Sequence, residues 1–313
     1  MLKSPRLDAI VYRTGGNNPC YVSEHGCSLA RDTDFYRSLS KLKSFVRDDL
    51  DSGFYPPDNF NYIRSFAMCV DTILTLRDGE IHQPFFSCSY EAEGYKGRRG
   101  FVSFCPTNYL SNSGNALMDS FQALGEVIEA RYVDESMKDL TRELPKTPLV
   151  TTFDLYDDMP GTREVSAIIQ RDSGSFVAFS PDIGLKYRAN DPYQALEGLE
   201  RSLSDNPSRA MGHILNAEPI FGPVDVQLNL QGSFSIKRFL ISVAPCRNGT
   251  RYYRAYAPQA GVTSKALTIE GALHDIKDSI ALRFRESTLT EVERSLQERP
   301  ILTTARMGPE WNN

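Results

Sequence analysis

The sequence has little that would place it in a membrane or hold it together with disulfides. No apolar run approaches the roughly 20 residues that a membrane-spanning helix needs, and the first residues contain no apolar signal-peptide core. The six cysteines, at positions 20, 27, 69, 88, 105 and 246, form no CxxC pair and show no regular spacing. These absences favour a soluble cytoplasmic protein with free thiols over a disulfide framework.

A strong charge of one sign is also missing. The chain has 35 Lys and Arg residues against 40 Asp and Glu residues, which gives a formal charge of −5. A uniformly basic nucleic-acid binder is therefore excluded, and the charge is too small to indicate a polyanionic DNA mimic. The 313 residues, 41% of them hydrophobic, are enough for a large folded core, in two domains or in several small ones.

The common catalytic signatures for dinucleotides, phosphates, zinc and serine nucleophiles do not occur. Cys20, His25 and Cys27 could form part of a metal site, but no fourth ligand is evident, so we interpret them as ordinary side chains. We expect no metal, no cofactor and no enzymatic activity.

Phosphoryl chemistry on Mg²⁺ needs several carboxylates to converge. The candidate carboxylates lie in predicted turns or at strand ends, and we interpret them as solvated turn residues: they are Asp71, Asp154, Asp157, Asp158 and Asp172.

What the sequence does contain is an internal repeat. Residues 176–184 read FVAFSPDIG and residues 253–261 read YRAYAPQAG, with two aromatics, a proline and a glycine at the same spacing. Each glycine is followed eleven positions later by Ala-Leu, at Ala195 and Ala272. A third copy is FVSFCP at 101–106, with Tyr109 in place of the glycine and Ala123-Leu124 as its pair, and a weaker fourth is YVSEHG at 21–26, leading to Ser38-Leu39. The repeat-defining residues are Phe101, Pro106, Phe176, Pro181, Gly184, Tyr253, Pro258 and Gly261.

Each copy predicts two strands, a turn and then a helix. The proline ends strand pairing because it has no amide donor, and the glycine suits a turn with positive φ. Turns between the strands are predicted at 171–174 and 247–249. Asp191-Pro192 and Thr268 predict helix starts. Apolar steps of three and four predict the helices, at Phe35, Leu39, Leu42, Val46; Leu117, Phe121, Leu124, Ile128; Tyr193, Leu196, Leu199, Leu203; and Ile269, Leu273, Ile276, Ile280.

The predicted fold class is therefore α+β, with four tandem units that each place one helix on a small antiparallel sheet. The units are predicted at 1–58, 59–145, 146–222 and 223–313, the last with a C-terminal helix at about 289–298 and a tail. Extended segments are expected after the helices, at 149–156, 224–230 and 301–306.

Residues 165–203 resemble the HicB antitoxin domain. The matching residues are Phe176, Val177, Pro181, Asp182, Gly184, Ala195 and Leu196. The resemblance implies a partial RNase H-like fold, and it implies binding and blocking of HicA-like toxins, which are small ribonucleases. The chain departs from the family in having four units instead of one. Its C-terminal stretch offers one helix, whereas family members often carry a DNA-binding segment there.

A basic and aromatic hairpin is the other candidate site. Arg247, Arg251, Tyr252 and Arg254 could contact phosphates and stack on the bases of single-stranded nucleic acid. Tyr253 and Tyr256 occupy core-like positions of the repeat, so part of this cluster is packing. A matching basic segment precedes the strand of the second copy, at Lys96, Arg98 and Arg99.

The sequence therefore favours a non-catalytic binding protein. We expect an antitoxin-like or anti-nuclease inhibitor, or a component of a microbial or phage conflict system, that masks a protein partner such as a basic toxin or nuclease. The alternative is a module that binds single-stranded RNA. No membrane partner is expected, and the oligomeric state, the source organism and the units that bind are left open.

Overall fold

The computed structural model describes residues 6–14, 20–25, 28–52, 62–93, 99–143, 148–154, 163–181, 183–205, 219–231, 233–248, 250–297 and 299–307. The chain divides into two compact units, Met1–Met159 and Pro160–Asn313. Each unit consists of antiparallel strands with helices packed on them, which confirms the α+β class. None of the described helices combines the length and the apolarity needed to cross a membrane.

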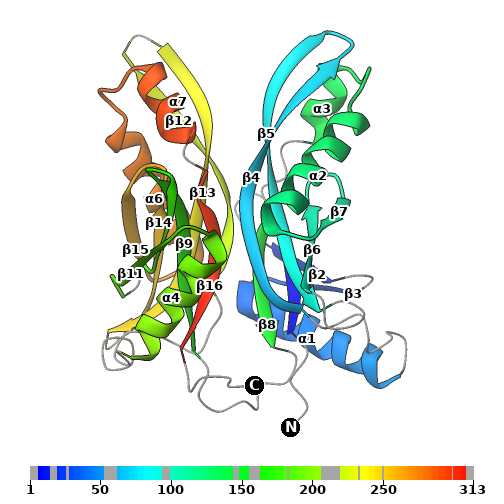
Figure 1. Ribbon diagram of the computed structural model, residues 1–313, viewed down its shortest axis with the longest axis vertical. Coiled ribbons are helices and arrows are strands. Elements are labelled where there is room, and N and C mark those ends of the chain that lie inside the picture. Colours follow the sequence, from blue (N-terminus) through cyan, green and yellow to red (C-terminus); the bar gives the residue numbers. More distant parts are fainter. Residues whose placement is uncertain are drawn as a thin grey trace. The chain divides into compact units, whose positions relative to one another are not determined.

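Unit 1 begins with three strands and a helix, continues with four strands and two helices, and ends with a strand. Within its antiparallel sheets the hydrogen-bonded orders are β8-β1-β2-β3 and β4-β5-β6-β7, and Figure 1 shows α2 and α3 against the second set. The elements are β1 (Arg6–Thr14), β2 (Cys20–His25), β3 (Ser28–Asp32), α1 (Phe35–Asp51), β4 (Tyr62–Leu76), β5 (Gly79–Glu93), β6 (Arg99–Cys105), β7 (Leu110–Gly114), α2 (Leu117–Arg131), α3 (Met137–Glu143) and β8 (Leu149–Asp154).

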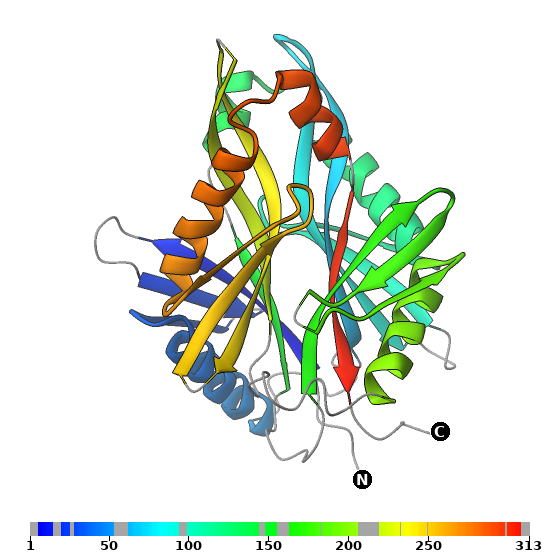
Figure 2. The same ribbon diagram turned by 90° about the vertical axis from the view of Figure 1, so that its left-hand side faces the viewer.

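Unit 2 repeats this order of elements. Its hydrogen-bonded strand orders are β16-β9-β10-β11 and β12-β13-β14-β15, and in Figure 2 α4 lies along β9–β11 while the red strand β16 runs beside β9. The elements are β9 (Arg163–Asp172), β10 (Ser175–Phe179), β11 (Lys186–Ala189), α4 (Pro192–Ser204), β12 (Ile220–Leu230), β13 (Ser233–Asn248), β14 (Thr250–Ala257), β15 (Val262–Ala266), α6 (Ile269–Arg283), α7 (Leu289–Gln297) and β16 (Ile301–Met307).

The last strand of each unit returns to the first strand of the same unit. β8 pairs antiparallel with β1, from Val11 opposite Leu149 to Arg6 opposite Asp154, and β16 pairs in the same way with β9. The predicted division placed residues 149–154 in the third unit, but their pairing joins them to the sheet of the first. The other predicted boundaries stay predictions.

The turns that define the repeat have one geometry in three places. Each proline ends its strand, and the residue three positions later has positive φ: this was predicted for Gly184 (φ 76°) and Gly261 (φ 64°), and Tyr109 (φ 59°) has the same conformation. The amide of this residue donates to the carbonyl four residues earlier, from Tyr109 to Cys105 (2.9 Å), from Gly184 to Ser180 (2.8 Å) and from Gly261 to Ala257 (2.9 Å).

The predicted helix starts are also confirmed. The Asp191 carboxylate accepts hydrogen bonds from the amides of Tyr193 and Gln194, with Pro192 in the first helical turn, and the Thr268 hydroxyl accepts one from the Gly271 amide. The C-terminal helix α7 forms close to its predicted bounds. At its start, hydrogen bonds from the Thr288 amide and hydroxyl lower the pKa of the Glu291 carboxylate.

The four main helices turn the same pattern of residues toward their sheets. The pattern occupies the first, fourth, fifth, eighth and twelfth helical positions, and all of its members are buried except the partly exposed Leu273. In α4, Pro192 takes the first place, and the predicted Tyr193 is partly exposed. The four sets are Phe35, Ser38, Leu39, Leu42, Val46; Leu117, Ser120, Phe121, Leu124, Ile128; Pro192, Ala195, Leu196, Leu199, Leu203; and Ile269, Ala272, Leu273, Ile276, Ile280.

This alignment corrects one expectation. In α2 the pair at the position of Ala195-Leu196 is Ser120-Phe121, and the predicted pair Ala123-Leu124 lies one turn further along the helix. Ser120 follows Tyr109 by eleven residues, which is the spacing of the other copies. The internal repeat in the sequence does not reveal the pair Ser120-Phe121, because serine stands in place of alanine and phenylalanine in place of leucine.

Each main helix and the strand before its turn carry a small buried residue at matching positions. In unit 1 the contact is a buried hydrogen bond between hydroxyls, from Ser23 to Ser38 (2.7 Å) and from Ser103 to Ser120 (2.7 Å). In unit 2 the same positions hold Ala178 with Ala195 and Ala255 with Ala272, all four fully buried. Small side chains let the helix backbone approach the strand closely.

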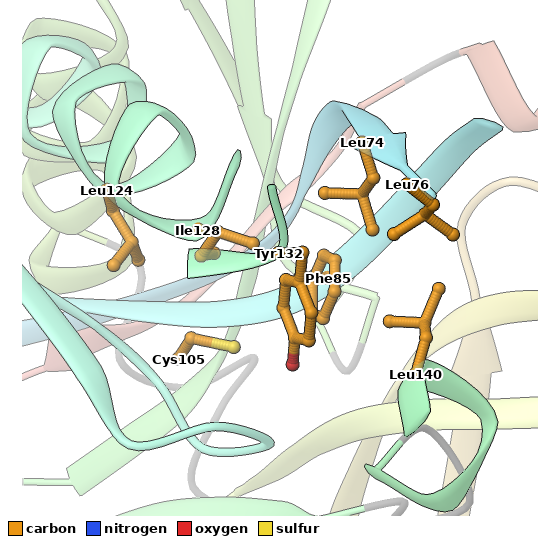
Figure 3. Close-up of a cluster of buried hydrophobic side chains, with 8 residues drawn as sticks. All are labelled: Leu74, Leu76, Phe85, Cys105, Leu124, Ile128, Tyr132 and Leu140. Carbon is orange, nitrogen blue, oxygen red and sulfur yellow. The ribbon is translucent and has the colours of Figure 1, made fainter. Parts of the chain in front are cut away.

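A second set of contacts also recurs in both units. In unit 1, Phe85 of β5 stacks on Tyr132 after α2 (centroids 5.6 Å apart), and Leu140 of α3 joins the same buried cluster (Figure 3). In unit 2, Phe239 of β13 stacks on Phe284 after α6 at 5.7 Å, and Val292 of α7 is buried.

The small-residue contact should be sensitive to size. We expect Ala195→Leu to destabilise the protein by about 1–3 kcal/mol, because a leucine there overpacks the layer between α4 and β10. Gln194→Leu, at the exposed neighbouring position of the same helix, should change the free energy of unfolding by less than about 0.5 kcal/mol. Urea unfolding followed by circular dichroism measures both, and equal effects would contradict the close packing.

Candidate functional site

The basic and aromatic hairpin is formed by β13 and β14. Arg247 pairs with Arg251 and Asn248 with Thr250 across the turn, which confirms the predicted hairpin, while Gly249 and the Arg247 side chain lie outside the described part. Lys96 and Arg98 also lie outside the described residues. Arg99 begins β6, but its side chain is not described.

Alternation along β14 divides the predicted site residues between two faces of the sheet. Tyr253 is buried on the face that also carries Ala255 and Ala257, and the Arg251 guanidinium lies over its ring, 5.4 Å from the centroid. Tyr252, Arg254 and Tyr256 point to the opposite face and are partly exposed. The predicted cluster is therefore split, with Tyr253 in a packing role as anticipated.

The face that carries Tyr252, Arg254 and Tyr256 is turned toward the other sheet of unit 2. Tyr256 makes an edge-to-face contact with Phe179 of β10, with ring centroids 5.8 Å apart. Arg254 donates to the carbonyl oxygen of Pro181 at 3.3 Å. Arg254 thus connects β14 to the turn after β10, and we assign it a structural role.

The two sheets of unit 2 are also in contact one strand further in, through two buried hydroxyl groups. Ser242 of β13 donates to Ser166 of β9 at 2.7 Å. Since β13 lies over β9 and β14 over β10, the next strands outward in the two sheets are β15 and β11. Both are short and largely exposed, and within the described part of the chain each pairs with one neighbouring strand.

Three cations on these outer strands were missed at the sequence level. Lys265 of β15 lies opposite Arg254 of the neighbouring strand β14, and its ammonium lies 5.8 Å from the centroid of the Tyr252 ring. Lys186 and Arg188 of β11 pair with Phe179 and Val177. A signal was present in the sequence, because Arg188 and Lys265 both lie four residues after the turn glycines Gly184 and Gly261.

The outer strands of unit 2 are strongly basic in an acidic protein. β10, β11, β14 and β15 together contain five Lys or Arg residues and no Asp or Glu residue. The corresponding strands of unit 1, β2, β3, β6 and β7, contain two basic and two acidic residues. Arg188 is partly neutralised, because it forms an ion pair with Asp172.

Three of the four main helices carry the opposite charge, whereas α1 contains four basic and three acidic residues. α2, α4 and α6 together contain eight Asp or Glu residues against four Lys or Arg residues. Exposed acids on them include Asp119, Glu126, Glu197, Asp275 and Asp278. Unit 2 therefore has basic outer strands and acidic main helices.

The carboxylates considered for Mg²⁺ do not come together where they are described. Asp71 is exposed on β4 and Asp172 pairs with Arg188, while Asp157, Asp158 and the Asp154 side chain lie outside the described part. Among the side chains that the structure places, no group of three or more His, Cys, Asp or Glu residues could hold a metal. Cys20 is placed, but Cys27 and the His25 side chain are not.

Comparisons with protein-family models, with curated proteins and with solved structures found no match to this chain.

Five cysteines are described and all five have free thiols. Cys20 and Cys69 are partly exposed, whereas Cys88, Cys105 and Cys246 are buried. Burial raises the pKa of the Cys105 thiol, which lowers its thiolate fraction at a given pH, and the thiolate is the reactive form.

Alkylation should follow this order. In the folded protein at mildly alkaline pH, we expect iodoacetamide to modify Cys20 and Cys69 first, and to modify Cys88, Cys105 and Cys246 only after unfolding in urea. Peptide mass spectrometry at successive times measures the order. Early modification of Cys105 in the folded state would contradict its burial.

Proposed function

We propose that this chain is a non-catalytic binding protein built from four HicB-like units, and that it blocks a basic protein partner such as a toxin or nuclease. In this proposal it acts in the cytoplasm as an antitoxin-like or anti-nuclease inhibitor, or as part of a microbial or phage conflict system. The mechanism is steric, since acidic surfaces cover the partner's nucleic-acid-binding surface.

The observation that carries this proposal is the recurrence of one local arrangement. In four places a strand is followed by a short edge strand and by a helix whose buried residues have the same spacing. An arrangement repeated with its core retained offers several similar outer surfaces on one chain. Several weak contacts on linked surfaces give a strong total affinity without any catalytic group.

The charge distribution supports a basic partner. The net charge of the four main helices is −3, from eleven acidic and eight basic residues, and α2, α4 and α6 supply the negative charge. Opposite charges speed the encounter of two proteins and favour the correct partner. An inhibitor that must reach a toxin quickly would benefit from acids on its outer helices.

The edge strands offer a second mode of contact. β7 reads LSNSG and carries no charge, whereas β11 and β15 carry Lys or Arg side chains. Charged side chains on an edge strand oppose the addition of another strand. We therefore favour β7 for any partner that binds by strand addition.

The proposal predicts capture of basic proteins that depends on the helix acids. The immobilised full chain should retain a small set of basic proteins from a lysate of its own host, and less of them as salt is raised from about 50 to 300 mM, because salt screens charges. A variant with Glu126→Gln, Glu197→Gln and Asp275→Asn should retain at least about fivefold less, which corresponds to a loss near 1 kcal/mol.

The matched control carries the same change of charge away from the main helices. Glu80→Gln, Asp134→Asn and Glu286→Gln alter exposed residues of strands and turns and should retain the captured proteins within about twofold. The captured proteins, identified by mass spectrometry, should lose nuclease or toxin activity when the purified chain is added. Activity that persists in the complex would contradict the masking mechanism.

A further inference from the structure

We propose that the basic outer strands of unit 2 bind a single-stranded nucleic acid, with Lys186, Arg251 and Lys265 contacting phosphates and Tyr252 stacking on a base. This inference concerns a surface that is separate from the acidic helices and a different class of ligand. Its test does not depend on whether the proposed protein partner exists.

The charge of these strands is the first argument. Four neighbouring strands with five cations and no acid create a positive local potential on a chain whose net charge is −5. The same strands of unit 1 are balanced, with two residues of each sign. The fold alone therefore does not require the cations, because the corresponding unit forms without them.

The second argument is that the cations share a face with an aromatic ring. Lys265 and Tyr252 lie on the face of β14–β15 that also carries Arg254, and the Lys265 ammonium lies 5.8 Å from the centre of the Tyr252 ring. Lys186 and Arg188 lie on the face of β11 shared with Phe179, which contacts Tyr256 of β14. The two basic strands thus border one side of unit 2 from both sheets.

The exposed part of the Tyr252 ring favours a single-stranded nucleic acid over a duplex as the ligand. A base can stack on Tyr252 only when it is unpaired and accessible, and stacking on aromatic rings tolerates any base. A base stacked there brings its adjoining phosphate toward Lys265. Exposed Arg251 lies near the hairpin tip on the opposite face of β14, over the Tyr253 ring, so it contacts a phosphate only where the bound strand passes around the tip.

Arg254 is excluded from the contact set, because its hydrogen bond to Pro181 holds the two sheets together. Tyr187 of β11 is also excluded. It is 41% exposed, but its ring covers Gly198 of α4, on the other side of the sheet. It therefore serves as a matched control for Tyr252.

Fluorescence polarisation with a labelled single-stranded uridine dodecamer tests this inference on the full chain. Binding should weaken with salt, with a log–log slope of roughly −2 for three phosphate contacts. Lys186→Gln, Arg251→Gln and Lys265→Gln together should weaken binding about tenfold or more at 50 mM salt. Tyr252→Leu should weaken it about fivefold or more, and Tyr187→Leu less than about twofold.

The control for charge is Arg37→Gln, Lys138→Gln and Arg294→Gln, which removes three exposed cations from helices and should leave the dissociation constant within about twofold. Thermal midpoints of all variants establish that they are folded.

Three outcomes would overturn the inference: no binding of the dodecamer by the unsubstituted protein, an equal loss in both triple variants, or a duplex of the same length that competes as well as the single strand.

Discussion

The packing of each main helix on its sheet depends on two small buried side chains, one on the helix and one on the strand before the turn. In unit 1 both partners are serines, and their hydroxyls bond to each other at 2.7 Å, so no buried polar group loses its partner. In unit 2 both partners are alanines. The pairs differ in chemistry but agree in size, which indicates that close approach is the property that matters. The turns with positive φ and the buried helix residues hold that contact in place.

The two units keep their cores and differ in their surfaces. The stacked rings Phe85–Tyr132 and Phe239–Phe284 occupy corresponding places, and the order of strands and helices is the same. The outer strands, in contrast, are balanced in charge in unit 1 and basic in unit 2. The difference in surface charge between units with the same order of elements motivates the two separate binding proposals.

Local patterns in the sequence predicted the local structure well. Prolines that end strands, glycines that need positive φ and helix caps act within a few residues, so their signals can be read from short windows. The pairing of β8 with β1 and of β16 with β9 could not be read in this way, because it joins strands separated by more than a hundred residues. Ser120-Phe121 occupies the helical position of the expected Ala-Leu pair with different residue types, so a search for Ala-Leu does not find it.

The candidate site was predicted only in part. The hairpin and its arginines were found from composition, but Lys186 and Lys265 join them through the stacking of two sheets, which sequence spacing does not reveal. Arg254, which the sequence predicts to contact a ligand, donates a hydrogen bond to the backbone carbonyl of Pro181 in the facing sheet, and its role in binding stays a prediction. A basic residue in a strand can bind a ligand or bond to the facing sheet. The sequence of the strand alone does not distinguish the two roles, because they depend on which sheet lies opposite.

The central claim is that one helix–strand contact recurs in all four places, and engineered disulfides test it most directly. Cysteine pairs at Ser23 and Ser38, Ser103 and Ser120, Ala178 and Ala195, and Ala255 and Ala272, introduced one pair at a time, report proximity because a disulfide needs Cβ atoms about 3.5–4.5 Å apart. Each pair should form its disulfide in the folded protein, and mass spectrometry after alkylation measures the fraction of molecules whose introduced cysteines stay unalkylated. Disulfides in the two serine-derived pairs together with free thiols in both alanine-derived pairs would contradict it.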